Sequence, residues 1–322
     1  MSPEQRLSGR RSTDGINMGK VTLLKYSNTN TYLIEGSHGA ILFDTGWAGT
    51  FNEFCRALGE AGKKLQDISY IFISHFHPDH MGIAQEIANH GPVIVVADVQ
   101  KDYIHSADSF FIRNRETSFI PIDDEKVKVV TCNESSKIFE SVGLHGSIIY
   151  TPGHSDDSIT LWLHDGELFV GDLNPLYELQ LHEGTEIGRS WKKLLMLSPR
   201  VVYYGHAKSY VFYEDNKDGR LADYDDAVER LRDVGGHEDG ATMSPGASKD
   251  VSIDAAQASA NADMYRLVSK IMKYIDKGYS LDKIEEKTGA DSVFIEDVNR
   301  MYLTHRNVGV QGILDRIEIK NR

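Results

Sequence analysis

Short apolar segments alternate with helix-like segments through most of this chain. Runs of consecutive apolar residues, such as Val93–Val96, are typical of strands that are buried on both faces. Segments with apolar residues three and four positions apart, such as 81–90, are typical of helices. Strands are expected at 20–25, 31–35, 40–43, 71–73, 93–96, 127–130, 148–150, 160–163, 167–170 and 201–205. Helices are expected between them at 50–62, 81–90 and 188–197. This alternation predicts a layered α/β fold.

Changes in composition and in the apolar pattern along the chain predict four segments. Residues 1–18 are polar and lack an apolar stretch, which predicts a disordered segment without a signal peptide. Residues 19–234 hold the expected strands and end in a helix at 220–234. Residues 235–262 are rich in Gly, Ser and Ala, so we expect a flexible linker. Residues 263–322 are expected to form a helical C-terminal domain.

Three helices are expected in the C-terminal domain, at 264–275, 281–288 and 293–303. The first carries an apolar stripe along its length, and monomers rarely leave such a stripe exposed. The stripe could pack on the first domain, on the later helices or in a homo-oligomer. The last two helices also resemble a helix-turn-helix. Residues 263–306 contain eight basic and eight acidic side chains, and a neutral module binds phosphates poorly, so a protein contact is favoured over DNA.

A dense cluster of potential metal ligands directly follows one of the expected strands. The sequence SHFHPDH places three histidines and one aspartate within a few positions. Imidazole nitrogens and carboxylate oxygens suit zinc, iron or manganese. Alternate residues point in different directions on the expected loop. His75 and His77 can therefore hold one ion, while Asp79 and His80 turn toward a second.

Three further residues of the same kind end other expected strands. Each follows an apolar run, and each has a glycine directly before it that lets the backbone turn. They are His154, Asp172 and His206. In layered α/β proteins, sites form at the carboxyl ends of strands. Seven such residues in one structural context predict a metal site rather than seven unrelated side chains.

These motifs resemble those of the metallo-β-lactamase superfamily. The HxHxDH motif of that family is matched by residues 75–80, and its first motif is matched by Ile41–Gly46. Its later single His, Asp and His correspond to His154, Asp172 and His206. The similarity covers roughly residues 20–215. It implies a four-layer αβ/βα sandwich, to which this chain adds an all-helical C-terminal extension.

The resemblance also implies two divalent metal ions, with zinc expected first and iron or manganese as alternatives. In that family one ion is held by the residues that match His75, His77 and His154. The other is held by those that match Asp79, His80 and His206, and the residue that matches Asp172 bridges the two. A hydroxide shared by two ions can act as a nucleophile near neutral pH. Asp79 or Asp172 could then carry a proton to the leaving group.

The expected function is hydrolysis of a small acyl substrate, which could be a thioester, an ester, a lactone or an amide such as a β-lactam. The net charge of −13 disfavours nucleic acid, because nucleic-acid binders neutralise phosphates with Lys and Arg. A phosphodiesterase or nuclease is the alternative that uses the same chemistry. A regulatory or binding protein that acts through its helical tail is an alternative from another class. Two cysteines and no apolar run long enough to span a bilayer predict a cytoplasmic protein without a membrane contact.

Two residues near the first motif are candidates for supporting roles. Asp44 ends an expected strand and could orient a metal-bound histidine, or it could cap a turn. Trp47 could line a substrate pocket, or it could pack in the interior. The segment 103–119 is rich in Phe and also contains arginines. It predicts either a lid over the site or a packed excursion on the surface.

Three residues later in the chain are candidates for contact with the substrate. Tyr177 and His182 lie on the expected loop after Asp172, and loops carry functional residues more often than regular elements do. Lys208 lies two residues beyond His206, where an ammonium group could hold a substrate carboxylate. A solvated lysine is the alternative for that position.

Overall fold

Two β-sheets form the centre of the first domain. The computed structural model describes residues 19–212, 255–304, 309–310, 312–314 and 317. In the first sheet the strand order is β1-β2-β3-β4-β5-β6. Its strands are β1 (Lys20–Leu24), β2 (Thr31–Glu35), β3 (Ala40–Phe43), β4 (Ile68–Phe72), β5 (Val93–Ala97) and β6 (Lys128–Val130). The first three strands pair antiparallel, whereas β3 to β6 run parallel.

The second sheet follows the order β11-β10-β9-β8-β7. Its strands are β7 (Gly146–Tyr150), β8 (Ile159–Leu163), β9 (Glu167–Phe169), β10 (Val201–Tyr203) and β11 (Tyr210–Val211). Among these five strands, β9 and β10 pair in parallel and the other neighbours pair antiparallel. The strands therefore lie within one or two residues of most of the expected positions, although β4 begins three residues earlier than the apolar run indicated.

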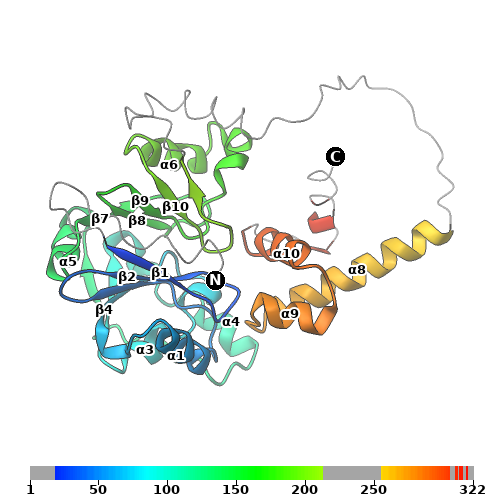
Figure 1. Ribbon diagram of the computed structural model, residues 1–322, viewed down its shortest axis with the longest axis horizontal. Coiled ribbons are helices and arrows are strands. Elements are labelled where there is room, and N and C mark those ends of the chain that lie inside the picture. The colour runs from blue at the N-terminus through cyan, green and yellow to red at the C-terminus, as the bar shows by residue number, and fades with distance from the viewer. Residues whose placement is uncertain (1–18, 213–254, 305–308, 311, 315–316, 318–322) are drawn as a thin grey trace.

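The packing of the side chains divides the domain into four layers, helices, sheet, sheet and helices (Figure 1). One face of the first sheet packs on α1 (Phe51–Glu60) and α3 (Ala84–Ala88). The other face packs on the second sheet through residues such as Phe43 and Phe169. The outer face of the second sheet packs on α6 (Glu186–Leu195). The predicted α/β sandwich is confirmed, and it follows from the apolar strands, which are buried on both sides.

The remaining short elements connect these layers. They are η2 (Leu65–Asp67), α2 (Pro78–Met81), η3 (Asp98–Tyr103), α4 (Asp108–Arg113), η4 (Cys132–Glu134), α5 (Ser136–Ser141) and η5 (Leu176–His182). The helix expected at 81–90 is divided into α2 and α3 by a break at Gly82. The amide of Gly82 donates to the carbonyl of Gly46 at 2.8 Å, and a Cβ at Gly82 would lie 2.1 Å from the backbone nitrogen of Ala48. The break is therefore fixed by a backbone contact that only glycine permits.

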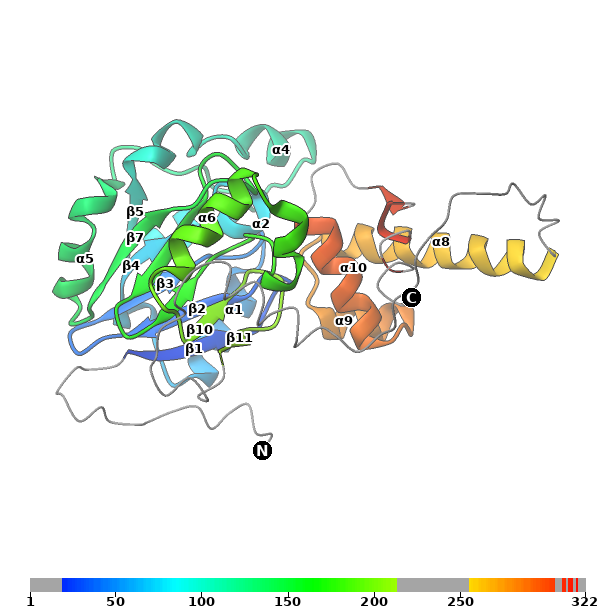
Figure 2. The same cartoon turned by 90° about the horizontal axis from the view of Figure 1, so that it is seen from above.

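A separate helical extension lies beside the sandwich, and α8 projects away from it (Figures 1 and 2). It contains α8 (Ala255–Ile275), α9 (Leu281–Thr288) and α10 (Ser292–Thr304). These helices share a core that includes Val268, Ile271, Ile284 and Val298. The apolar stripe of the first helix is therefore covered mainly by the later helices. Met264, at its start, stays 41% exposed.

Helix α8 corrects the expected linker. The linker prediction extended to residue 262, but the helix already begins at Ala255. Residues 255–262 contain five alanines, and alanine has the highest intrinsic helix propensity. The segment 1–18, the helix expected at 220–234 and the rest of the linker lie outside the described residues. Within the described part of the chain, no helix has both the length and the apolar character needed to cross a membrane.

Candidate metal centre

The ligand-type residues lie where strands of both sheets end. His75 follows β4, and His77 occupies the N-cap of α2. Pro78 at the first helical position favours this start, because its fixed φ suits the helix and its missing N–H is not needed there. The sequence had indicated a loop at Asp79 and His80. In the structure both residues lie on the first turn of α2. His154, Asp172 and His206 follow β7, β9 and β10 and approach from the second sheet.

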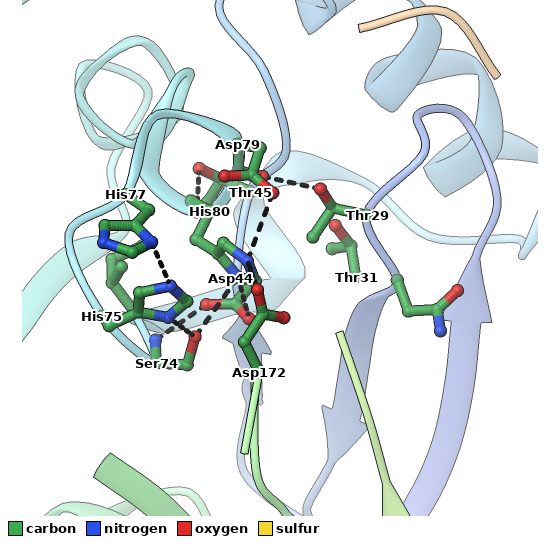
Figure 3. A network of polar contacts seen from close by, with 12 residues as sticks. Thr29, Thr31, Asp44, Thr45, Ser74, His75, His77, Asp79, His80 and Asp172 are labelled. Carbon is green, nitrogen blue, oxygen red and sulfur yellow. Dashed lines mark hydrogen bonds and ion pairs between the residues drawn. The ribbon is translucent and has the colours of Figure 1, made fainter. Parts of the chain in front are cut away.

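Three histidines form the first ligand group. His75, His77 and His154 each offer a nitrogen, and these atoms lie within 4.8 Å of one another. His75 Nε2 lies 2.9 Å from His77 Nδ1, and His154 Nε2 lies 3.2 Å from the same atom. We call these residues the three-His group. Figure 3 shows His75 and His77 facing each other at one side of the centre.

Two aspartates and two histidines form the second ligand group. Asp79, His80, Asp172 and His206 are all buried, and their ligand atoms also lie within 4.8 Å of one another. His206 Nε2 is 2.9 Å from Asp79 Oδ2, and His80 Nε2 is 3.3 Å from Asp172 Oδ2. We call these residues the mixed group. Asp172 Oδ2 is also 3.7 Å from His154 Nε2, so this carboxylate lies between the two groups.

Hydrogen bonds behind the mixed group determine which nitrogen of each histidine faces the centre. His80 Nδ1 lies 2.9 Å from Asp44 Oδ2 (Figure 3), and His206 Nδ1 lies 3.0 Å from the carbonyl oxygen of Asn28. Carboxylate and carbonyl oxygens can only accept, so each Nδ1 carries the proton. In the neutral form of each ring, the lone pair is then on the Nε2 that points inward.

The protonation of the two groups differs in the absence of an ion. Burial lowers the pKa of His75 well below its ordinary value and that of His154 to about 4. Burial opposes charge on His80 too, but the nearby carboxylates, Asp172 first, outweigh it and raise the pKa of His80 well above its ordinary value. Burial would raise the pKa of Asp172, but His206 and His80 lower it to about 2. The three-His group is thus neutral near pH 7, whereas the mixed group attracts positive charge.

These residues fit a pair of metal ions. Among the described residues, His80 Nε2 and Asp172 Oδ1 are buried without a hydrogen-bond partner, and an ion between them would satisfy both. Neutral imidazoles and ionised carboxylates are the forms that bind a metal. The backbone leaves room for the ligands at Gly205, where a Cβ would lie 2.5 Å from Asp172 Oδ1 and 2.9 Å from His80 Cε1. This close approach explains the glycine that precedes His206.

Trp47 and Lys208, two candidates for contact with the substrate, make side-chain contacts outside the two ligand groups. Trp47 is buried, and its Nε1 donates to Asn28 Oδ1 at 2.8 Å. This placement agrees with the packing alternative. The side chain of Lys208 is 79% exposed, and its Nζ lies 3.4 Å from Glu296 Oε2 on α10. Lys208 thus contacts the helical extension.

The other candidate substrate contacts lie on η5, at the side of the second sheet. His182 is half-buried, and its backbone carbonyl accepts from Thr185 Oγ1 at the start of α6. His182 belongs to neither ligand group. The side chain of Tyr177 lies outside the described residues. The bonds of Asp44 to His80 and to the amide of Ser74 are those of a residue that positions a ligand.

The segment 103–119 packs on the first sheet's helical layer. Phe111 is buried and stacks on Phe119 with ring centroids 4.0 Å apart, and Phe110 approaches Trp47 at 6.0 Å. Arg113 is exposed to solvent. These contacts agree with a packed excursion on the surface rather than with a lid of aromatic rings and arginines.

Three residues that contact the ligand motifs were not predicted from the sequence. Ser74 Oγ lies 2.9 Å from His75 Nδ1, and Asp157 Oδ2 accepts from the amide of Phe76 at 2.7 Å. The carbonyl of Asn28 contacts His206, as described above. Ser74 and Asp157 lie within or beside a ligand motif, and that proximity was a usable signal. Asn28 lies in a turn between β1 and β2, and no pattern distinguished it from other turn residues.

Comparisons with known proteins agree with this geometry. A family model described as the metallo-beta-lactamase superfamily matches residues 25–206. The chain is 28% identical over 203 residues to the Beta-lactamase-like protein 2 homolog of Drosophila melanogaster, and the match covers 60% of this chain and 62% of that protein. It is 27% identical over 160 residues to the Atrochrysone carboxyl ACP thioesterase AacuM of Aspergillus aculeatus, with 49% and 42% covered.

One solved structure was matched at low sequence identity. The metallo-beta-lactamase family protein TTHA1429 from Thermus thermophilus aligns over 94% of both chains, with a TM-score of 0.48 and 16% identity. The matches to the two curated relatives span less than two thirds of their lengths. The family model, however, covers more than half of the 322 residues here and includes all seven ligand-type positions. The chain belongs to the metallo-beta-lactamase superfamily.

Proposed function

We propose that the protein is a dinuclear metal-dependent hydrolase that acts on small acyl substrates. The observation that carries this proposal is the meeting of two ligand groups at one carboxylate, Asp172, which lies 3.3 Å from His80 and 3.7 Å from His154. Seven ligand residues are too many for one tetrahedral ion, so the arrangement supports two ions, which the three-His group and the mixed group would hold. Zinc is the first candidate, and iron or manganese are alternatives with similar ligand preferences.

The chain's own residues prepare the site before any substrate arrives. In the three-His group His75 Nε2, His77 Nδ1 and His154 Nε2 converge, and in the mixed group His80 and His206 present Nε2. Two ions bound there would supply Lewis acidity and a water that is acidic enough to act as a nucleophile near neutral pH. Asp44 and Ser74 hold His80 and His75 in the required orientation, so little reorganisation is needed.

Two carboxylates are available to handle protons. Asp79 Oδ2 lies beside His206 and His80, and Asp172 lies between the groups. Both stay ionised at neutral pH, because the buried histidines hold the pKa of each carboxyl below its ordinary value despite the opposing effect of burial. We propose that one of them accepts the proton of the attacking water and passes it to the leaving group.

An acyl substrate is favoured over a phosphodiester for two reasons. The net charge of −13 repels polyanions. One of the relatives is named as a thioesterase, which makes a thioester the first class to test. Residues 19–212 would form the catalytic unit, and the helices α8, α9 and α10 a helical accessory unit. A cytoplasmic location and a homo-oligomer formed through the extension remain predictions.

The test is turnover of a matched substrate panel by the zinc-loaded protein. The panel contains an acyl thioester, the corresponding oxygen ester, a lactone, a β-lactam and a bis-aryl phosphodiester. Asp172→Asn, which keeps the volume of the side chain but removes its charge, serves as the inactive control. Faster hydrolysis of an acyl substrate than of the phosphodiester would support the proposal. Preference for the phosphodiester, or no hydrolysis beyond that of the Asp172→Asn control, would contradict it.

A further inference from the structure

The helical extension contacts the residue that orients His206. The carbonyl oxygen of Asn28 accepts two hydrogen bonds, one from His206 Nδ1 at 3.0 Å and one from Asn299 Nδ2 at 3.2 Å. His206 belongs to the mixed group, whereas Asn299 lies on α10 of the extension. Both Asn28 and Asn299 are buried, so water does not replace either donor readily. One backbone carbonyl thus joins a metal ligand to a helix that lies far away in the sequence.

The side chain of Asn28 is held by both domains as well. Its Nδ2 donates to the carbonyl of Ile275 in the last turn of α8 at 3.0 Å. Its Oδ1 accepts from Trp47 Nε1 at 2.8 Å. The chain then turns at Gly278, with φ of 67°, where a Cβ would come within 2.7 Å of Trp47. The side-chain amide and the backbone carbonyl of Asn28 are therefore both hydrogen-bonded, and two of their partners, Ile275 and Asn299, belong to the extension.

A second contact anchors α10 on the same side of the centre. Arg300 Nη1 lies 2.6 Å from Glu178 Oε1, and both side chains are largely buried. Glu178 also accepts from Asn174 Nδ2 at 3.0 Å, and Asn174 lies two residues beyond Asp172. The position of Asn299 is thus set by its neighbour Arg300 and not by a single weak bond.

We infer that Asn299 is a positioning residue for the metal centre, so that docking of the helical extension and metal binding by the mixed group are coupled. The inference rests on the proposed metal-dependent function. Loss of the Asn299 donor frees the Asn28 carbonyl, which in turn loosens the His206 ring. Partners of metal-bound histidines typically change metal affinity by about 10-fold to 100-fold when removed, and Asn299 acts one residue further away, so we expect about 3-fold to 10-fold. Coupling is reciprocal, so metal binding must also strengthen docking of α10.

The experiment measures the two steps of zinc binding by competition with a chromophoric chelator. Asn299→Ala is compared with Glu296→Ala, one turn earlier on α10, which removes the ion pair with Lys208 but touches no residue of the centre. We expect Asn299→Ala to weaken one step by about 3-fold to 10-fold and to leave the other unchanged, and Glu296→Ala to change neither. The inference would be overturned if Asn299→Ala weakened zinc affinity at both steps or at neither step. It would also be overturned if Glu296→Ala weakened zinc affinity equally.

A double variant assigns the affected step. In a His206→Ala background the histidine that Asn28 orients is gone, so adding Asn299→Ala should change the remaining zinc affinity by less than about twofold. A further loss as large as in the unaltered chain would contradict a route through His206. Since zinc affinity is read without substrate, the outcome is independent of whether the acyl panel is hydrolysed.

A measurement on the unaltered chain covers the case in which Asn299→Ala does not fold. Hydrogen exchange of the amides of α10 and of the end of α8 is followed with and without zinc. Reciprocal coupling requires slower exchange in both segments when zinc is present, by about 3-fold to 10-fold. The N-terminal part of α8, where Met264 is exposed, serves as the internal reference. Equal exchange with and without zinc in α10 would overturn the inference.

Discussion

The three-His group and the mixed group lie side by side, yet they differ in charge and in what supports them. The three-His group contains no carboxylate, and its rings are neutral near pH 7 because burial lowers the pKa of His75 and His154. The mixed group contains two aspartates that favour a cation. Its histidines are oriented by Asp44 and Asn28, whereas the hydroxyl of Ser74 lies 2.9 Å from His75 Nδ1 and also 3.2 Å from His80 Nδ1.

Because of this difference, the two ligand groups depend on different interactions for their geometry. The mixed group is held together by charge and by contacts from distant segments, including the helical extension. The three-His group comes from the segment after β4 and the loop after β7, which are joined by the hydrogen bond from the amide of Phe76 to Asp157 Oδ2. Changes in pH or in the extension should therefore act on the mixed group first. Asp172 lies between the two groups, so a change at this residue should affect both of them.

The largest effect is expected for Asp172→Ala. Because this carboxylate lies between both groups, its loss should reduce kcat/KM for acyl hydrolysis by about a thousandfold or more, which is about 4 kcal/mol of transition-state stabilisation. Far-ultraviolet circular dichroism should be unchanged, since the core is built from other residues. Asp156→Ala, an exposed aspartate in the same part of the fold, is the control. Activity of Asp172→Ala within about tenfold of the unaltered chain would contradict a shared role.

Metal content should separate the two groups. The unaltered chain is expected to hold about two zinc ions, because each group offers at least three ligands. His206→Ala should retain about one ion in the three-His group, and His77→Ala about one in the mixed group. Elemental analysis after gel filtration measures this. Two ions in either variant, or none in the supplemented unaltered chain, would show that the ligands are not divided in this way.

Acid should weaken the mixed group before the three-His group. The pKa of His80 and His206 is raised because nearby carboxylates outweigh burial, so protons compete with metal there as the pH falls through those raised values. Burial lowers the pKa of His154 to about 4, so that nitrogen stays free of protons in the same range. Zinc affinity should fall by up to about tenfold per pH unit for each displaced proton in the mixed group.

The measurement compares the single-site variants between pH 8 and pH 5. His77→Ala, which keeps the mixed group, should lose zinc affinity steeply, and His206→Ala, which keeps the three-His group, should change little until lower pH. If zinc affinity depended equally steeply on pH in the two variants, the proposed electrostatic difference between the groups would be contradicted.

The smallest effect is expected for Lys208→Ala, two residues beyond a ligand of the mixed group. Its ammonium is exposed and pairs with Glu296, and exposed ion pairs contribute at most about 1 kcal/mol to the free energy of unfolding. The free energy of unfolding measured by urea denaturation should fall by no more than about 1 kcal/mol, and KM should change by less than about twofold. A rise in KM of about tenfold or more for an acidic acyl substrate, with no change for a neutral one, would indicate that Lys208 binds the substrate carboxylate.

Much of the fold and of the ligand set could be predicted because their signals are local. A strand buried on both faces needs consecutive apolar residues, so Val93–Val96 and Ala40–Phe43 were recognisable without any long-range information. Ligands at strand ends are marked by residue type, and Gly205 before His206 marked a close approach. The start of α8 resembles a linker in composition because it lacks large apolar residues, but the high helix propensity of its alanines extends the helix to Ala255.

Residue type and spacing within single segments were enough to predict the layered fold, the set of ligand-type residues and the existence of a helical extension. Three contacts became apparent only in the folded structure: Trp47 packs beneath Gly278, Lys208 faces Glu296, and Asn28 lies between His206 and Asn299. The opposite pKa shifts of His80 and His154 were likewise beyond the sequence. These features depend on which side chains from distant segments share a buried space, and such distances are set only when the chain has folded.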